Sequence, residues 1–249
     1  MDCCMGLEHL IHTCGLVVLP ICTKMMRWFA ILPFLALWML CGCKKTTDDY
    51  KAKGLEYFPI RVGAERHYEY DSIHYSRIQN KAQVFHFLIK EFVKDSFIDQ
   101  AGNNAYRLEQ FVSKDTGKSY QFFDLVTVSI NGFGVQRVEE NRRNQVLSFP
   151  IRNLKMWYPY SYWNDSFNSY IKFQYTAVGK PFSNGFVQSA DAVYIKQQYD
   201  STFIYVREAR EIYGNAFGLM YRKKKDIDFQ DPSKPDGFDL TWQLTKYYP

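Results

Sequence analysis

Short runs of alternating apolar and polar residues, rich in aromatic and β-branched side chains, fill the chain after residue 60. Turn-forming residues separate the runs, for example at Gly102–Asn104, Asp115–Gly117, Asn131–Gly132 and Asp236–Gly237. A period of two with regularly spaced turns is typical of antiparallel strands joined by hairpins. The pattern predicts about eleven strands: Arg66–Arg77, Gln83–Asp95, Tyr106–Ser113, Tyr120–Ile130, Gly134–Glu139, Gln145–Ile151, Tyr170–Val178, Ala192–Gln198, Thr202–Arg207, Phe217–Lys223 and Leu240–Tyr247.

An antiparallel sheet with this many strands has to curl, close or split into two layers. The predicted fold is therefore mainly β with little helix, either one curved, barrel-like sheet or a β-sandwich. No long segment of helical period alternates with the strands, which argues against a parallel α/β fold. The composition agrees, because all 19 Tyr residues lie after Cys43 and aromatic side chains suit pleated surfaces.

A different pattern, one continuous apolar run, precedes the strands. Trp28–Leu40 spans 13 residues and follows the basic residues Lys24 and Arg27. A membrane-spanning helix needs about 20 residues, whereas this length and charge are typical of a signal peptide. The run ends in Leu40-Cys41-Gly42-Cys43, which resembles the bacterial lipobox.

The lipobox resemblance implies that residues 1–42 are a signal peptide and that Cys43 is the lipid attachment site. Two or more acyl chains would anchor the protein stably, at roughly 0.8 kcal/mol per buried CH₂. The alternative is an uncleaved membrane helix or a buried apolar segment. Residues 43–54 are polar and predict a flexible tether, and residues 55–249 predict a single β-rich domain.

The stretch of residues 1–24 is longer than the segment that usually precedes the basic residues of a signal peptide. We therefore favour a mis-assigned start, with translation beginning at Met25 or Met26. The alternative is a true extension that contains a second apolar segment, Leu10–Cys22.

Cysteine placement narrows the chemistry of the predicted domain. The six cysteines end at Cys43, so the domain can have no internal disulfide, no thiol nucleophile and no cysteine-ligated zinc. The formal charge of +5 is mild. It suits a soluble surface, and nucleic-acid binding, which needs clustered charge, is not expected.

The densest aromatic cluster predicts a ligand-binding site. The cluster lies between residues 157 and 163. Its alternating rings could stack on sugar rings, and the side chains of Asn164 and Asp165 that follow could form hydrogen bonds with sugar hydroxyl groups. The alternative is that the rings pack into the core with their polar atoms at the rim. The candidate binding residues are Trp157, Tyr158, Tyr160, Tyr162 and Trp163.

No metal, cofactor or catalytic set is predicted. His67, His74 and His86 are the histidines after Cys43. His67 and His74 are an odd number of residues apart, so on one strand they face opposite sides. The basic run Arg222–Lys225 is interpreted as a solvated strand end; the alternative is contact with anionic headgroups.

Three short segments resemble a family of uncharacterised Bacteroidota lipoproteins: Tyr57–Gly63, Leu147–Ile151 and Tyr213–Tyr221. The resemblance spans most of the predicted domain, although His67-Tyr68 replaces a tryptophan usual after the opening glycine. It implies an all-β fold and a cell-envelope location, and it supplies no reaction. Charges after Cys43 resemble surface-export signals, and the periplasmic and cell-surface faces of the outer membrane both stay open.

Two functional hypotheses follow. The favoured one is a non-catalytic outer-membrane lipoprotein that binds a glycan, a lipid or a protein partner, or has a structural role. It predicts an exposed aromatic groove. The alternative is a periplasmic or surface hydrolase, which predicts a cleft joining a histidine or two carboxylates with shifted pKa values.

Overall fold

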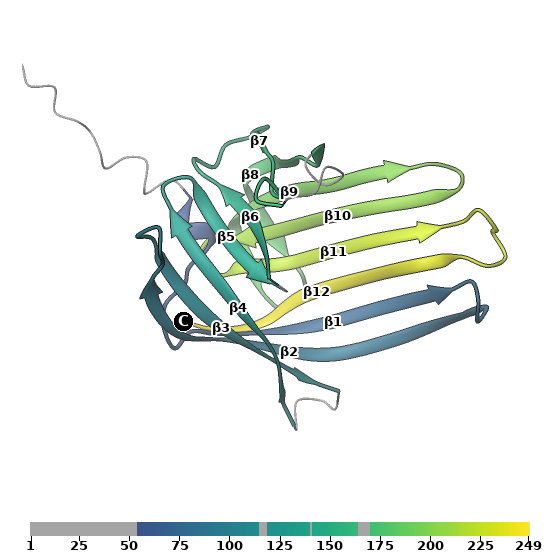
Figure 1. Cartoon of the computed structure of the whole chain (residues 1–249), viewed down its shortest axis with the longest axis horizontal. Coiled ribbons are helices and arrows are strands. Elements are labelled where there is room, and N and C mark those ends of the chain that lie inside the picture. Colours follow the sequence, from purple (N-terminus) through teal and green to yellow (C-terminus); the bar gives the residue numbers. More distant parts are fainter. Residues whose placement is uncertain (1–53, 115–118, 140, 164–169) are drawn as a thin grey trace, which may run out of the picture. The chain divides into compact units, whose positions relative to one another are not determined.

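The computed structural model describes residues 54–114, 119–139, 141–163 and 170–249. These residues form one twelve-stranded sheet (Figure 1), and every adjacent pair of strands is antiparallel. A short 3-10 helix, η1 (Leu55–Tyr57), precedes it. The strands are β1 (Glu65–Ser76), β2 (Lys81–Ile98), β3 (Asn104–Ser113), β4 (Gln121–Asn131), β5 (Gly134–Glu139), β6 (Arg142–Ser148), β7 (Met156–Trp157), β8 (Phe173–Ser183), β9 (Gln188–Ser201), β10 (Tyr205–Gly214), β11 (Gly218–Asp228) and β12 (Asp236–Tyr248).

The strand order places the first and last strands together in the middle of the sheet. It reads β6-β5-β4-β3-β2-β1-β12-β11-β10-β9-β8-β7. The two halves of the chain therefore run outward in opposite directions from the β1–β12 pair. The edge strands β6 and β7 follow one another in the sequence, so the sheet has to curl to bring its two edges within reach.

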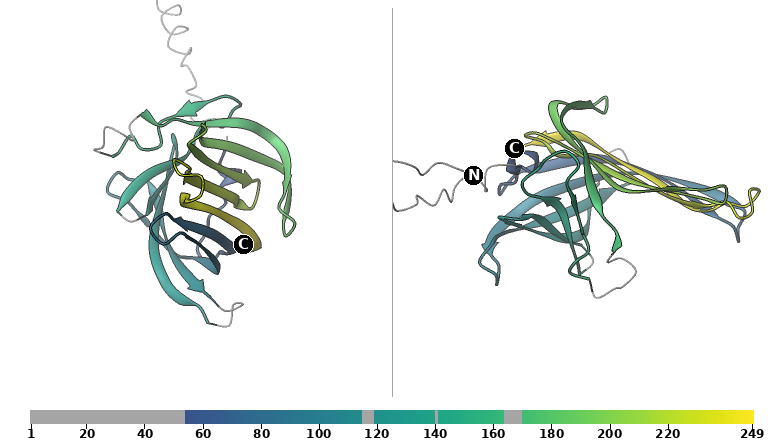
Figure 2. Two further views of the ribbon diagram at one scale, coloured as in Figure 1. Left: turned by 90° about the vertical axis from the view of Figure 1, so that its right-hand side faces the viewer. Right: turned by 90° about the horizontal axis from the view of Figure 1, so that it is seen from above.

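The curl nearly closes the sheet into a barrel (Figure 2). Between the edges, the amide of Gln145 donates to the carbonyl of Pro159 at 2.9 Å. The Tyr175 hydroxyl accepts from the Ser148 amide at 2.9 Å and donates to the Ser148 carbonyl at 3.1 Å. The predicted curved, barrel-like antiparallel sheet is thus confirmed. The additional strand is β7, whose two residues are too few for a periodic pattern.

The sheet has two distinct parts, which we call the closed end and the open end. β3 pairs with β2 only from Leu88 to Ile98, and β8 pairs with β9 only between Gln188 and Lys196. Beyond these limits β2, β1, β12, β11, β10 and β9 continue as a six-stranded extension, the open end. Figure 1 shows these strands running past the part that β3–β8 complete, the closed end.

The hydrophobic core lies on the inner face of the closed end. Leu108, Val126 and Val128 are fully buried there, as strand alternation requires for side chains of one face. The three segments that carry the family resemblance all supply core residues, among them Phe58 and Tyr213, whose rings lie 6.2 Å apart. In this structure these segments serve packing.

Candidate functional site

A hollow of about 330 Å³, which we call the inner pocket, lies on the inner face of the closed end. Because the sheet curls, β3–β6 form one wall and β11 and β12 form the other. The size falls in the range of small-molecule sites, about 300–1,000 Å³. A deeper hollow of about 80 Å³ continues it and shares five of its residues. The lining is Gln110, Phe123, Asp124, Glu139, Arg142, Asn144, Tyr160, Trp163, Arg222, Lys224 and Trp242.

A network of buried ion pairs forms the floor of the inner pocket. Glu91 is 4% exposed and accepts hydrogen bonds from Arg137 at 2.7 Å and from Gln110 at 3.1 Å. Arg137 also binds Glu139. These groups come from strands β2, β3 and β5, with β4 between the last two, and their pairing offsets the large cost of burying charge.

A second buried pair closes the other side of the floor. Glu211 of β10 accepts a hydrogen bond from Arg222 of β11 at 2.6 Å and another from the Tyr213 hydroxyl at 2.8 Å. The Arg222 guanidinium also lies 5.3 Å from the centre of the Trp242 ring. Arg222 is therefore held by Glu211 and by the ring of Trp242.

The carboxylates of Glu91 and Glu139 keep their charges around neutral pH. Burial by itself raises the pKa of Glu91, but Arg137 and Arg66 outweigh it and hold the pKa below its usual range. The pKa of Glu139 is lowered in the same way, against burial, by Arg137 and Arg222. A general acid or base works best with a pKa near the operating pH, and these carboxylates are shifted away from it.

The rim of the inner pocket holds polar groups that lack such partners. Among the described residues, neither Arg142 nor Lys224 forms an ion pair with a carboxylate, although Arg142 lies 4.9 Å from the centre of the Trp163 ring. Asp124 is the acidic neighbour, and its carboxylate accepts from the Leu125 amide. The Oδ1 atom of Asn144 is shielded from solvent and has no hydrogen-bond partner in the described part of the chain.

The structure divides the predicted aromatic site. Tyr160 and Trp163 line the inner pocket, with ring centres 4.4 Å apart. Trp157 is buried, and its indole donates to the Gln145 carbonyl at 2.8 Å. Tyr158 is exposed beside Lys172. Tyr162 is exposed and binds Gln136 at 2.6 Å, so these last three side chains lie outside the pocket.

Two other predictions, the signal peptide and the lipid attachment at Cys43, concern residues outside the described ones.

Sequence reasoning missed the charged and amide groups of the pocket. The sequence pattern predicts a solvated strand end for the basic run at 222–225, yet this run lies inside β11, with Arg222 paired to Glu211. Asn144 precedes the strand predicted from Gln145, although β6 begins at Arg142. The alternation of Arg222 and Lys224 along one strand is a signal that could have placed both on one face.

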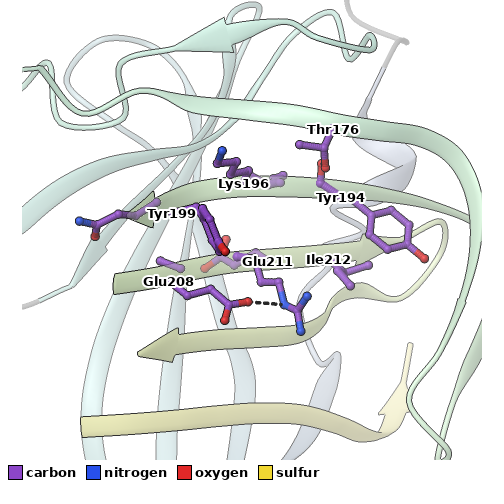
Figure 3. Close-up of a pocket in the computed structure, with 11 residues that line it drawn as sticks. Thr176, Tyr194, Lys196, Tyr199, Glu208, Glu211 and Ile212 are labelled. Carbon is purple, nitrogen blue, oxygen red and sulfur yellow. Dashed lines mark hydrogen bonds and ion pairs between the residues drawn. The ribbon is translucent and has the colours of Figure 1, made fainter. Parts of the chain in front are cut away.

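A second hollow of about 310 Å³ lies on the outer face, over β8, β9 and β10 (Figure 3). The strand pairing beside it is irregular, with register shifts at Tyr175/Ala177 and at Ala209/Arg210. Arg210 pairs with Glu208 at 3.3 Å, Lys196 lies over the Tyr199 ring, and no buried side-chain atom of the described residues that lacks a hydrogen-bond partner belongs to the lining of this hollow. We therefore regard the inner pocket as the stronger candidate.

The histidines lie away from both hollows. His86 pairs with Asp71 at 2.7 Å, and both side chains are about half exposed; neither lines the inner pocket or the outer hollow. No cluster of three or more metal-ligating side chains occurs among the described residues. Within the same residues, no helix has the length and apolarity needed to span a bilayer.

Comparison with known proteins adds little to this description. No protein-family model matches the chain, and no curated protein matches it. A crystal structure described as a "putative lipoprotein" from Parabacteroides distasonis aligns with a TM-score of 0.42 and 10% sequence identity. The alignment covers 77% of this chain and 98% of that chain. At this level of similarity it carries no argument about function.

Proposed function

We propose that this protein is a lipid-anchored envelope protein that binds a ligand in the inner pocket and catalyses no reaction. The observation that carries the proposal is the Asn144 Oδ1 atom, which is buried at the pocket without a partner in the described residues. Leaving a buried acceptor unsatisfied costs about 1–3 kcal/mol. A ligand that donates a hydrogen bond to this oxygen would recover that cost.

Three further features of the pocket suit binding. Tyr160 and Trp163 offer aromatic surface, and Arg142 and Lys224 offer positive charge. The deeper charges are fixed in ion pairs, so they can shape a site without moving protons. Apolar walls with a few convergent polar groups are typical of ligand pockets.

The anchor rests on the sequence of residues 24–43. A basic step, a short apolar run and a small residue before Cys43 together favour cleavage and lipidation. Radiolabelled palmitate should enter the wild-type protein and should not enter a Cys43→Ala variant. Equal labelling of the two would remove the anchor from the proposal.

The binding test uses the full-length protein extracted from envelope membranes and analysed by native mass spectrometry. We expect a bound small molecule that is lost in Asn144→Leu and Lys224→Met. Lys196→Met, which removes a lysine from the outer hollow instead, should keep it. Binding in the inner pocket is contradicted if the wild type carries no adduct, or if Lys196→Met loses it as completely as Lys224→Met.

A further inference from the structure

The inner face of the open end carries a continuous surface of ring side chains, which we call the aromatic shelf. It crosses three adjacent strands, β12, β1 and β2. The centres of neighbouring rings lie 5.3–6.3 Å apart along the series. The shelf consists of Trp242, Tyr70, Phe87, Phe85, His74 and Phe238.

The shelf begins at the inner pocket. Trp242 lines the pocket, and its ring lies 5.6 Å from that of Tyr70, the next member of the shelf. From Tyr70 to His74 the shelf follows four residues of β1, or roughly 13 Å at about 3.3 Å per residue. Phe123, 64% exposed, adds apolar surface to the lining of the pocket.

An open sheet edge lies along one side of the shelf. Residues 81–87 of β2 extend beyond the pairing with β3, which starts at Leu88. Figure 2 shows the open end as a single layer of strands that extends past β3–β6. The rings of Phe85 and Phe87, stacked at 13°, shield one another and are half-buried.

Polar groups are sparse on the shelf and concentrated in the pocket. On β1 the residue between Tyr70 and His74 that shares their face is Ser72, whose Oγ is buried without a partner among the described residues. A sugar would need several hydrogen-bonding groups along this surface. Hydrocarbon needs none, and burying it on aromatic rings is favourable in proportion to the area covered.

The charges at the pocket end of the shelf favour an anion. Arg142 and Lys224 face the pocket without carboxylate partners in the described ranges, whereas Asp124 is the one acidic lining residue outside the floor network. Two cations against one carboxylate leave an excess of positive charge. A negatively charged head at this point would place its chain toward Trp242 and the shelf.

We propose that the site holds an anionic amphiphile, with its charged head between Arg142 and Lys224 and its hydrocarbon chain along the aromatic shelf. This inference rests on the proposed function and names the class of ligand. A free fatty acid and an anionic single-chain phospholipid share this chemistry. The head-group hydroxyls of a lysophosphatidylglycerol can in addition donate to the Asn144 Oδ1 atom, whereas an ionised fatty-acid carboxylate only accepts hydrogen bonds.

The test uses photoactivatable palmitate that carries a diazirine in its chain. Membranes containing the full-length protein are incubated with this probe and irradiated, and the adducts are mapped by mass spectrometry. In the wild type we expect adducts on the segments of β1, β2 and β12 that carry the shelf. Labelling of the Phe85→Ser/Phe87→Ser variant should fall about ten-fold, the loss expected from removing apolar contact area. Phe122→Ser, which removes an exposed ring from the outer face of β4, should label like wild type.

The head-group contact is tested with a matched neutral probe. Arg142→Ala/Lys224→Ala should label about ten-fold less with photoactivatable palmitate and unchanged with the fatty alcohol of equal length. A lysophosphatidylglycerol competitor that blocks labelling better than oleate indicates the phospholipid as the preferred source, and the reverse order indicates the fatty acid.

Wild-type adducts that spread evenly over both faces of the sheet would overturn the amphiphile assignment, and this outcome needs no variant to fold. An Asn144-dependent adduct in native mass spectrometry, together with no labelling of the shelf, would overturn the amphiphile and leave the proposed binding function standing. Loss of both signals would remove both proposals.

Discussion

The closed and open ends are parts of one sheet, yet they use their inner faces in opposite ways. At the closed end the inner face meets other strands, and charged residues such as Glu91 and Arg137 are buried in pairs. At the open end the same face carries rings and more exposed charges, such as Arg207 and Asp226. The difference shows that strand alternation sets which side chains share a face, whereas curling decides whether that face becomes an interior.

The largest expected effect is the loss of a buried charge partner at the closed end. Arg137→Met leaves the Glu91 carboxylate with Gln110 and the more distant Arg66, 4.0 Å away. Removing one partner of a buried pair costs about 3–5 kcal/mol of unfolding free energy. Urea unfolding of the detergent-solubilised protein, followed by tryptophan fluorescence, measures this loss.

The matched change at the open end is Arg207→Met. It removes an arginine on the same face from a pair whose side chains are 42% and 51% exposed. Exposed pairs contribute only about 0.2–1 kcal/mol. If the two variants lose equal stability, the distinction between a buried interior and an open face is wrong.

The second-largest expected effect is the pH dependence of the free energy of unfolding that the buried carboxylates of the closed end produce. The folded-state pKa values of Glu91 and Glu139 are lowered, whereas glutamates in the unfolded chain have a pKa of about 4.3. As the pH falls below that value, the unfolded chain takes up protons first, so stability falls until the folded-state pKa values are passed. Each carboxyl contributes a slope of at most about 1.4 kcal/mol per pH unit.

Urea midpoints measured from pH 7 to pH 3 report this slope. Glu91→Gln should flatten it, because one of the two carboxyls no longer titrates. Asp226→Asn at the open end serves as the control. A slope that Glu91→Gln leaves intact would mean that the network does not govern acid stability.

The sequence predicted local features well and long-range ones poorly. Hairpins such as β3–β4 and β9–β10 follow from alternation and turn residues, which are local. The pairing of β1 with β12 joins residues far apart in the sequence, such as Tyr70 and Trp242, and no local pattern encodes that register. The aromatic shelf depends on this pairing and could not be foreseen.

The inner pocket also combines features that the local sequence predicts with features that depend on long-range pairing. The aromatic stretch at 157–163 stands out by composition, and two of its members, Tyr160 and Trp163, do line the pocket. Arg142 and Asn144 gave no signal, because a strand that starts with polar residues lacks apolar alternation. Their position depends on the sheet edges meeting, which the Tyr175–Ser148 hydrogen bonds secure.

The smallest expected effect has opposite signs at the two ends. Ser189 at the closed end is 5% exposed, and its hydroxyl donates to the Asp191 carbonyl at 2.6 Å. Ser189→Ala should therefore cost about 1 kcal/mol. Ser72 at the open end is 1% exposed, but its Oγ has no partner among the described residues.

Ser72→Ala should leave the free energy of unfolding unchanged or raise it slightly, because an unpaired buried hydroxyl is removed at little change in volume. It should also preserve photoactivatable-palmitate labelling, since a methyl group beside Phe85 is at least as apolar as a hydroxyl. Parallel urea unfolding of the two alanine variants decides the matter. A loss at Ser72 as large as that at Ser189 would show that its hydroxyl is satisfied, and the shelf would then be more polar than the ring contacts indicate.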